Sequence, residues 1–135
     1  MKRLPLAILF IVILGCDKNA PVAPGLTQIR LGEAFTMRPG ETAYSSDGMF
    51  TLRFDSVLED SRCPEGMMCI WAGQAVIALT IDERCDTMKA FTELTEKGFS
   101  VLLKELYPNP PASPMNPKSQ YLAEFIVTKI LRRGI

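Results

Sequence analysis

The chain has 135 residues, and its 15 Lys and Arg balance its 15 Asp and Glu to a formal net charge of zero. This balance excludes the strong single-sign field that draws a protein to nucleic acid or to an anionic surface. Histidine is absent, which removes the commonest general base and excludes Ser–His and Cys–His nucleophiles. We therefore expect a protein that is not an enzyme, with no catalytic residues and no cofactor or resident metal.

The first fifteen residues have the pattern of a secretory signal. Lys2 and Arg3 precede an almost wholly apolar run from Leu4 to Leu14. At ~1.5 Å per residue this run would make a helix of roughly 16 Å, whereas a membrane-spanning helix needs ~20 residues. The sequence therefore predicts a cleaved signal peptide over residues 1–15 and no stable transmembrane segment there.

The signal ends in Ile13–Cys16, which reads ILGC and resembles the lipobox of bacterial lipoproteins: an aliphatic, a variable and a small residue, then cysteine. The resemblance implies cleavage before Cys16, with diacylglycerol on its thiol and a further fatty acyl chain on its amino group. Two or more chains hold a protein firmly at a membrane. Residues 16–27 would form a tether, and the lipid on Cys16 would anchor the protein to the inner or outer membrane of a bacterial cell envelope.

From residue 28 onward, short segments of alternating apolar and polar residues predict β-strands. Such segments lie at 33–38, 42–46, 49–60, 74–82, 88–95, 99–107 and 121–131. Turn signals separate them every 8–12 residues, which is typical of a β-sandwich or barrel of immunoglobulin-like size. We expect residues 28–135 to form one all-β domain, a single antiparallel β-sandwich of seven or eight strands.

The third of these segments gives the sharpest local prediction. Phe50, Leu52 and Phe54 alternate with polar residues, so they should face the core together. The alternation slips after Asp55, which indicates a β-bulge near Ser56.

Four connections carry expectations of their own. The Asp-Gly pair at 47–48 and the Glu-Lys-Gly triplet at 96–98 are hairpin turns, and 82–86 (DERCD) reads as a polar turn. Residues 108–117 contain five prolines and cannot form a central strand or a helix interior. That segment is either a crossover between sheets or an exposed recognition loop.

Cys63 and Cys69 bracket a loop in which Pro64 and Gly66 let the chain turn back on itself. In an oxidising compartment the two should close as a structural disulfide. For so short a loop the entropy model gives about 2–2.5 kcal/mol of stabilisation. A redox-active pair is disfavoured, because such a pair usually has two residues between its cysteines.

Met67 and Met68 stand inside that loop. Together with the two cysteines they offer the soft sulfur ligands that copper(I) prefers, so a soft-metal site is the alternative to the disulfide. Packing within the loop is the other role open to the methionines.

Cys85 is left over once Cys16 is acylated and the loop pair is closed. A buried inert thiol is the favoured interpretation, ahead of an intermolecular disulfide or an exchange of partners with the loop cysteines. The acids of the same turn have oxygens that could hold calcium, although acidic turns are more often simply solvated.

Trp71 is the only tryptophan of the chain. A buried indole removes ~150–250 Å² from water, about 4–6 kcal/mol as an upper limit, so we expect it in the core, packed on the disulfide. The alternative is an aromatic side chain that stacks on a ligand, with Met67 and Met68 as further contacts. Asp60 and Arg62 should form a surface ion pair worth ~0–1 kcal/mol.

Residues 54–79 (FDSVLEDSRCPEGMMCIWAGQAVIAL) resemble a motif of small uncharacterised secreted bacterial proteins and lipoproteins, F-x-x-V…D-S-R-C-P…C-x-W-A-G. The resemblance implies a secreted β-domain and no particular chemistry. We expect a lipid-anchored envelope domain that is a binding or structural module, with an envelope protein as candidate partner and no nucleic acid. The alternative is an inhibitor-like or copper-binding periplasmic interaction protein.

Overall fold

The structure, a computed structural model, describes residues 25–108 and 120–131. Cys16, the predicted signal and most of the proline-rich segment therefore lie outside the described residues. The strands are β1 (Leu26–Ile29), β2 (Ala34–Met37), β3 (Thr42–Ser45), β4 (Thr51–Asp60), β5 (Ala75–Ile81), β6 (Arg84–Lys89), β7 (Glu93–Glu96), β8 (Phe99–Tyr107) and β9 (Leu122–Lys129). The all-β prediction is confirmed, with nine strands among these residues instead of seven or eight.

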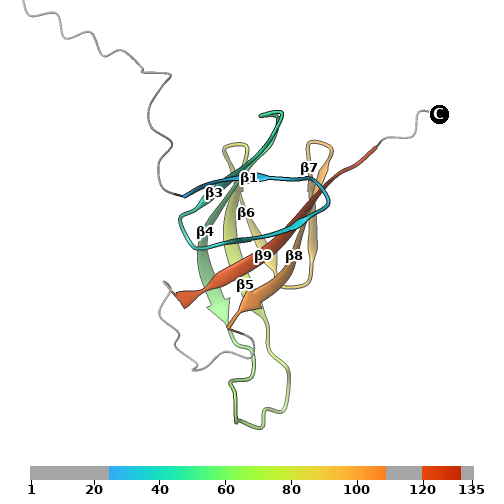
Figure 1. The fold of residues 1–135 in the computed structure, drawn as a ribbon. Coiled ribbons are helices and arrows are strands. Elements are labelled where there is room, and N and C mark those ends of the chain that lie inside the picture. The colour runs from blue at the N-terminus through green and yellow to red at the C-terminus, as the bar shows by residue number, and fades with distance from the viewer. Residues whose placement is uncertain (1–24, 109–119, 132–135) are drawn as a thin grey trace, which may run out of the picture.

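Two sheets form the sandwich (Figure 1). The larger sheet has the order β1-β3-β4-β5-β6 and the smaller one the order β2-β9-β8-β7. All pairs are antiparallel except β1 and β3, which run parallel at one edge of the larger sheet, so the predicted antiparallel β-sandwich is confirmed with one parallel pair added. The parallel pair arises because β2 crosses to the smaller sheet before the chain returns as β3. The first strand begins at Leu26, inside the range that the sequence assigns to the tether.

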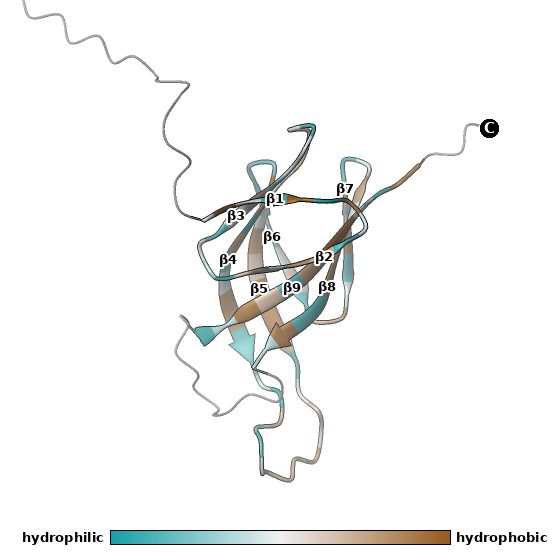
Figure 2. Cartoon of the chain, in the orientation of Figure 1, coloured by the Kyte–Doolittle hydropathy of each residue, from teal (hydrophilic) through white to brown (hydrophobic). Residues whose placement is uncertain are grey.

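The core lies between the inner faces of the two sheets. Along β5 every second residue is buried, and the same alternation runs along β9, as two stacked faces require. Apolar residues accordingly concentrate on the central strands in Figure 2. Phe50 packs on Phe99 with ring centroids 4.9 Å apart, and Phe54 meets Phe125 edge-on at 6.0 Å. These ring pairs join one sheet to the other.

Several local predictions are confirmed. The side chains of Phe50, Leu52 and Phe54 face the core together, and all three are fully buried. Strands β3 and β4 pair across the Asp-Gly turn, and β7 and β8 pair across the second predicted turn. The register between β4 and β5 shifts from Phe54 to Ser56, where the sequence indicates a bulge.

Two predictions, the polar turn at 82–86 and the strand at 88–95, need correction. The turn after β5 consists of Asp82 and Glu83 alone, both with positive φ, which is the geometry of a two-residue hairpin. Arg84 and Cys85 therefore belong to β6. The segment 88–95 is also not one strand. It breaks at Phe91, where φ is 63°, and the chain passes from the edge of the larger sheet to the edge of the smaller one.

Candidate functional site

The candidate site is the connection between β4 and β5, residues 61–74, which we call the cysteine loop. It projects from one end of the sandwich (Figure 1). Its two limbs extend the pairing of the strands below them: Ser61 N donates to Gln74 O at 2.8 Å, and Cys63 N donates to Ala72 O at 3.2 Å. The side chain of Ser61 adds a further contact between the limbs, because Gln74 N donates to Ser61 Oγ at 3.1 Å. The base of the loop is thus a narrow, hydrogen-bonded stalk.

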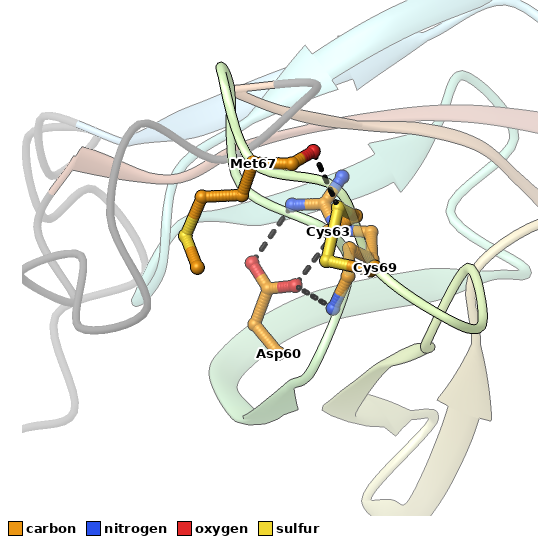
Figure 3. The surroundings of a disulfide bond; sticks show 5 residues. Asp60, Cys63, Met67 and Cys69 are labelled. Atoms are coloured by element: carbon orange, nitrogen blue, oxygen red, sulfur yellow. Dashed lines mark hydrogen bonds and ion pairs between the residues drawn. A yellow bond between two sulfur atoms is a disulfide. The ribbon is translucent and has the colours of Figure 1, made fainter.

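A disulfide closes the outer part of the loop (Figure 3). Cys63 and Cys69 are bonded, with their Cα atoms 5.8 Å apart, so the predicted pairing is confirmed. Between them Met67 N donates to Pro64 O at 3.2 Å. Gly66 has a φ of 75°, a conformation that glycine adopts without steric cost. Proline, glycine and the two cysteines together make a compact cross-linked tip.

Gly73 lets the two limbs approach each other. Its φ is 68°, and a Cβ built on it would lie 1.8 Å from the carbonyl oxygen of Ser61. No larger residue fits without forcing the limbs apart. The glycine that ends the W-A-G motif is therefore a requirement of the stalk.

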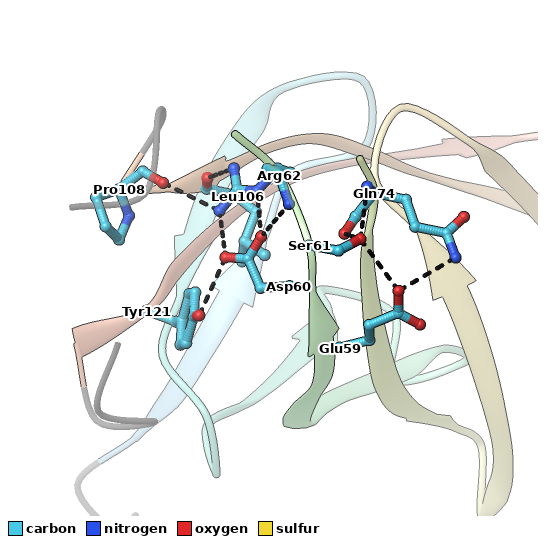
Figure 4. A network of polar contacts seen from close by, with 8 residues as sticks. All are labelled: Glu59, Asp60, Ser61, Arg62, Gln74, Leu106, Pro108 and Tyr121. Carbon is cyan, nitrogen blue, oxygen red and sulfur yellow. Dashed lines mark hydrogen bonds and ion pairs between the residues drawn. The ribbon is translucent and has the colours of Figure 1, made fainter. Parts of the chain in front are cut away.

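A buried ion pair holds the base of the loop against the sandwich (Figure 4). Arg62 Nε and Nη2 donate to the two oxygens of Asp60, each at 2.8 Å, and the side chains are only 9% and 7% exposed. Arg62 Nη1 also donates to Leu106 O at 2.7 Å, and Nη2 to Pro108 O at 3.0 Å. The predicted ion pair between Asp60 and Arg62 is thus present, but it is buried and not at the surface, because the end of β8 covers the guanidinium.

Tyr121 completes this network from the start of β9. Its hydroxyl donates to Asp60 Oδ2 at 3.0 Å. Burial by itself would raise the pKa of Asp60, but the hydrogen bonds and positive charge of Arg62, with the tyrosine hydroxyl, outweigh it and hold that pKa below its ordinary value. The carboxylate is therefore a charged, fully engaged anchor and not an acid or base poised for catalysis.

The outer residues of the loop are exposed and apolar. Trp71 is 80% exposed, Ile70 98% and Met68 102%, and Met67 is also exposed. The expectation that Trp71 lies in the core is wrong. The disulfide joins residues of one loop beyond the end of the sandwich, so none of the described strands forms a second layer over the indole. Both methionines likewise face outward, where a ligand or partner can reach them.

Open grooves lie on both sides of Trp71. One, of about 360 Å³, is lined by Arg62, Pro64, Met67 and Ile70 among others. The other, of about 320 Å³, is lined by Glu59, Ser61, Gly73 and Gln74. The first is mainly apolar and extends from the base of the loop to its tip. The second is more polar and faces its base.

The other sulfur and acidic candidates are less suited to a ligand. Of the four sulfur side chains in the loop, closure of the disulfide leaves only the thioethers of Met67 and Met68 for copper(I). Cys85 is a free and exposed thiol on the edge strand β6, so the expectation of a buried thiol is wrong. Asp82 accepts hydrogen bonds from Thr51 N and Oγ1 and faces Lys97. Within the described ranges, no three His, Cys, Asp or Glu side chains gather in a group able to hold a metal ion.

Comparison of the chain with protein-family models, with curated proteins and with solved structures found no match. Across residues 25–108 and 120–131, the structure contains no helix with the length and apolar character that crossing a membrane requires.

Sequence reasoning found the cysteine loop but missed two of its side chains, Ile70 and Gln74. It also missed two side chains outside the loop, Glu59 of β4 and Tyr121, that contribute to the site. Ile70 had a signal: it completes an apolar run between two strands, and such runs in a connection are usually functional. Tyr121 had none, because it lies 61 residues away from Asp60 along the chain.

Proposed function

We propose that this protein is a lipid-anchored cell-envelope domain that binds another molecule through the exposed face of its cysteine loop. The observation that carries the proposal is the 80% exposure of Trp71. The other side chains of the D-S-R-C…C-x-W-A-G segment have structural partners: the ion pair, the limb hydrogen bond and the disulfide. The indole of Trp71 makes none of these contacts and is open to solvent.

The energetics of the loop support a binding role. Exposed apolar side chains that cluster on a soluble domain mark interaction sites, and tryptophan is prominent among the residues that dominate binding energy. A flexible loop would lose conformational entropy on binding. This loop is already fixed by a disulfide, a buried ion pair and limb hydrogen bonds. Most of its conformational entropy is therefore lost on folding and not on binding.

The position of the loop fits attachment through the N-terminal segment. Leu26 pairs with Thr42, which pairs with Arg53 on β4. The loop leaves β4 only after Asp60, roughly 20 Å further along at ~3.3 Å per residue. A domain tethered through residues before Gly25 would therefore offer the loop at a distance from its attachment point.

An inhibitor-like interaction is the second candidate. The loop is narrow, cross-linked and convex, with exposed side chains at its tip. This is a shape that can enter the cleft of a partner enzyme. The alternative would be distinguished by a partner whose catalytic activity falls when the loop binds.

The anchor is tested on protein extracted from bacterial membranes. Mass spectrometry should find Cys16 as the acylated N-terminal residue. An unmodified N-terminus at another position would contradict the lipid anchor without affecting the binding proposal.

Two exposed methionines give a matched test of the binding face. Met68 lies on the loop, and Met49, 66% exposed, lies on the hairpin before β4. Envelope components captured by photo-crosslinking of the full chain should be lost in Trp71→Ser and Met68→Ser and retained in Met49→Ser. Equal capture by all variants would refute the loop as the binding surface.

A further inference from the structure

The second groove beside Trp71, at the base of the cysteine loop, combines the indole with a more polar lining than the first groove has. Its volume is about 320 Å³, at the small end of the range for ligand sites. An exposed indole lines one part, and a carboxylate, an amide and a hydroxyl line the remainder. None of its five lining residues, including Gly73, is cationic.

The polar groups of this groove are held in place but not saturated. Ser61 Oγ donates to Glu59 Oε1 at 3.1 Å, and Gln74 Nε2 approaches the same oxygen at 3.5 Å. No described residue donates to Glu59 Oε2 or to Gln74 Oε1. Figure 4 shows both oxygens directed away from the network. Two acceptors, and the second N–H of the amide, thus remain available to a ligand.

We propose that this groove binds a sugar ring of an uncharged glycan. A pyranose has one face of C–H groups and a rim of hydroxyls. The C–H face can cover the indole of Trp71, which buries apolar area on both partners. The rim hydroxyls can donate to Glu59 and exchange hydrogen bonds with Gln74. The volume suits a group of about one ring. This inference rests on the proposed function, because it names the class of ligand that the exposed Trp71 would bind.

Other ligand classes fit these contacts less well. An anionic group would meet the Glu59 carboxylate with no cation in the groove to offset it. A purely apolar ligand would cover that carboxylate and leave it without solvent or partner, which is costly. A nucleoside shares the combination of a flat ring and hydrogen-bonding groups, so it serves as the competing class in the test.

The single tryptophan supplies a direct readout, because all indole fluorescence of the chain comes from Trp71. The full chain is titrated with cellotriose, maltotriose and the N-acetylglucosamine trimer, and separately with adenosine. We expect a saturable change in emission with at least one trisaccharide, at a dissociation constant of about 1 mM or below. Glu59→Ala and Gln74→Ala should each weaken that binding about tenfold or more. Met49→Ala, on the hairpin before β4 and away from the loop, should leave it unchanged.

Thermal unfolding of each variant checks that these exposed substitutions leave the fold intact. The sugar assignment is overturned if no trisaccharide gives a saturable change, if adenosine binds and the sugars do not, or if Glu59→Ala and Gln74→Ala bind as tightly as the natural chain. If the sugar assignment fails while crosslinking still depends on Trp71 and Met68, the loop remains a binding site for another class of molecule. Crosslinking that is indifferent to both residues would count against the proposed function itself.

Discussion

Arg62 lies against Asp60 in a two-pronged ion pair, with both N···O distances at 2.8 Å and both side chains less than a tenth exposed. The same guanidinium reaches the carbonyl groups of Leu106 and Pro108. One side chain therefore ties the cysteine loop to the end of β8. The proposed binding face depends on this contact for its position.

Arg62→Met should destabilise the protein by about 3–5 kcal/mol, because it leaves the Asp60 carboxylate buried and unpaired. Asp60→Leu combined with Arg62→Met should cost less than Arg62→Met alone, since no buried charge then remains without a partner. Urea unfolding of the three proteins measures both effects. If the double variant is no more stable than Arg62→Met alone, the buried charge of Asp60 is not what makes the single change costly.

Stability should fall at acid pH through the same pair. The pKa of Asp60 in the folded protein is below its ordinary value, which is about 3.9 in an unfolded chain. The contribution of Asp60 is therefore fully present above pH ~4 and is lost as the pH falls through the lower, folded pKa. Unfolding midpoints measured from pH 6 down to pH 2 should show this decline, and Asp60→Asn should show a shallower one. Parallel declines in the two proteins would assign the effect to other carboxylates.

Gly73→Ala should be far more damaging than Gly66→Ala, although both glycines have positive φ and lie in the same loop. At Gly66 the new methyl group meets open space, so only backbone strain of about 1–2 kcal/mol is expected. At Gly73 it would collide with the Ser61 carbonyl group, and the limbs must separate at a cost of roughly 3 kcal/mol or more. Comparison of the two unfolding free energies is the measurement. Similar values would mean that the limbs are not held as closely as the structure has them.

If Cys16 is acylated as proposed, thiol counting should find one reactive cysteine in the unreduced protein. Cys85 is exposed and free, while Cys63 and Cys69 are joined. Cys85→Ser should therefore abolish labelling by a thiol reagent under native conditions. Three reactive thiols would refute the disulfide.

Replacing both loop cysteines by serine should lower the unfolding free energy by about 2–2.5 kcal/mol.

Trp71→Ala should leave stability almost unchanged, within about 0.5 kcal/mol, as is usual for an exposed side chain. A core tryptophan would cost about 3–5 kcal/mol on the same change. Acrylamide should also quench the fluorescence of the natural protein efficiently, because solvent reaches the indole. Weak quenching, together with a large loss of stability in Trp71→Ala, would mean that the indole lies in the core.

Much of the local structure was predictable, because it depends on neighbours in the chain. The alternation of Phe50, Leu52 and Phe54 predicts a buried strand face, and the slip near Ser56 predicts the bulge. The spacing of Cys63 and Cys69 predicts their bond. Each signal lies within a few residues, so side-chain direction and turn geometry are sufficient to interpret it.

The candidate site was only half predictable, because its decisive contacts come from distant segments. Arg62 is buried by carbonyl groups that lie 44 and 46 residues away. Tyr121 reaches Asp60 across 61 residues. No spacing in the sequence indicates that these segments meet, so Asp60 and Arg62 look like an ordinary surface pair until β8 and β9 are in place.

The sequence by itself determined that this protein is built from β-strands and where its disulfide closes, since period-two alternation and loop spacing are local properties. Only the tertiary structure decided which sheet each strand joins and which side chains end up covered. The case of Trp71 shows the reason. Burial depends on whether a second layer of structure lies over a residue, and the cysteine loop projects past the end of the sandwich, where none of the described strands covers it.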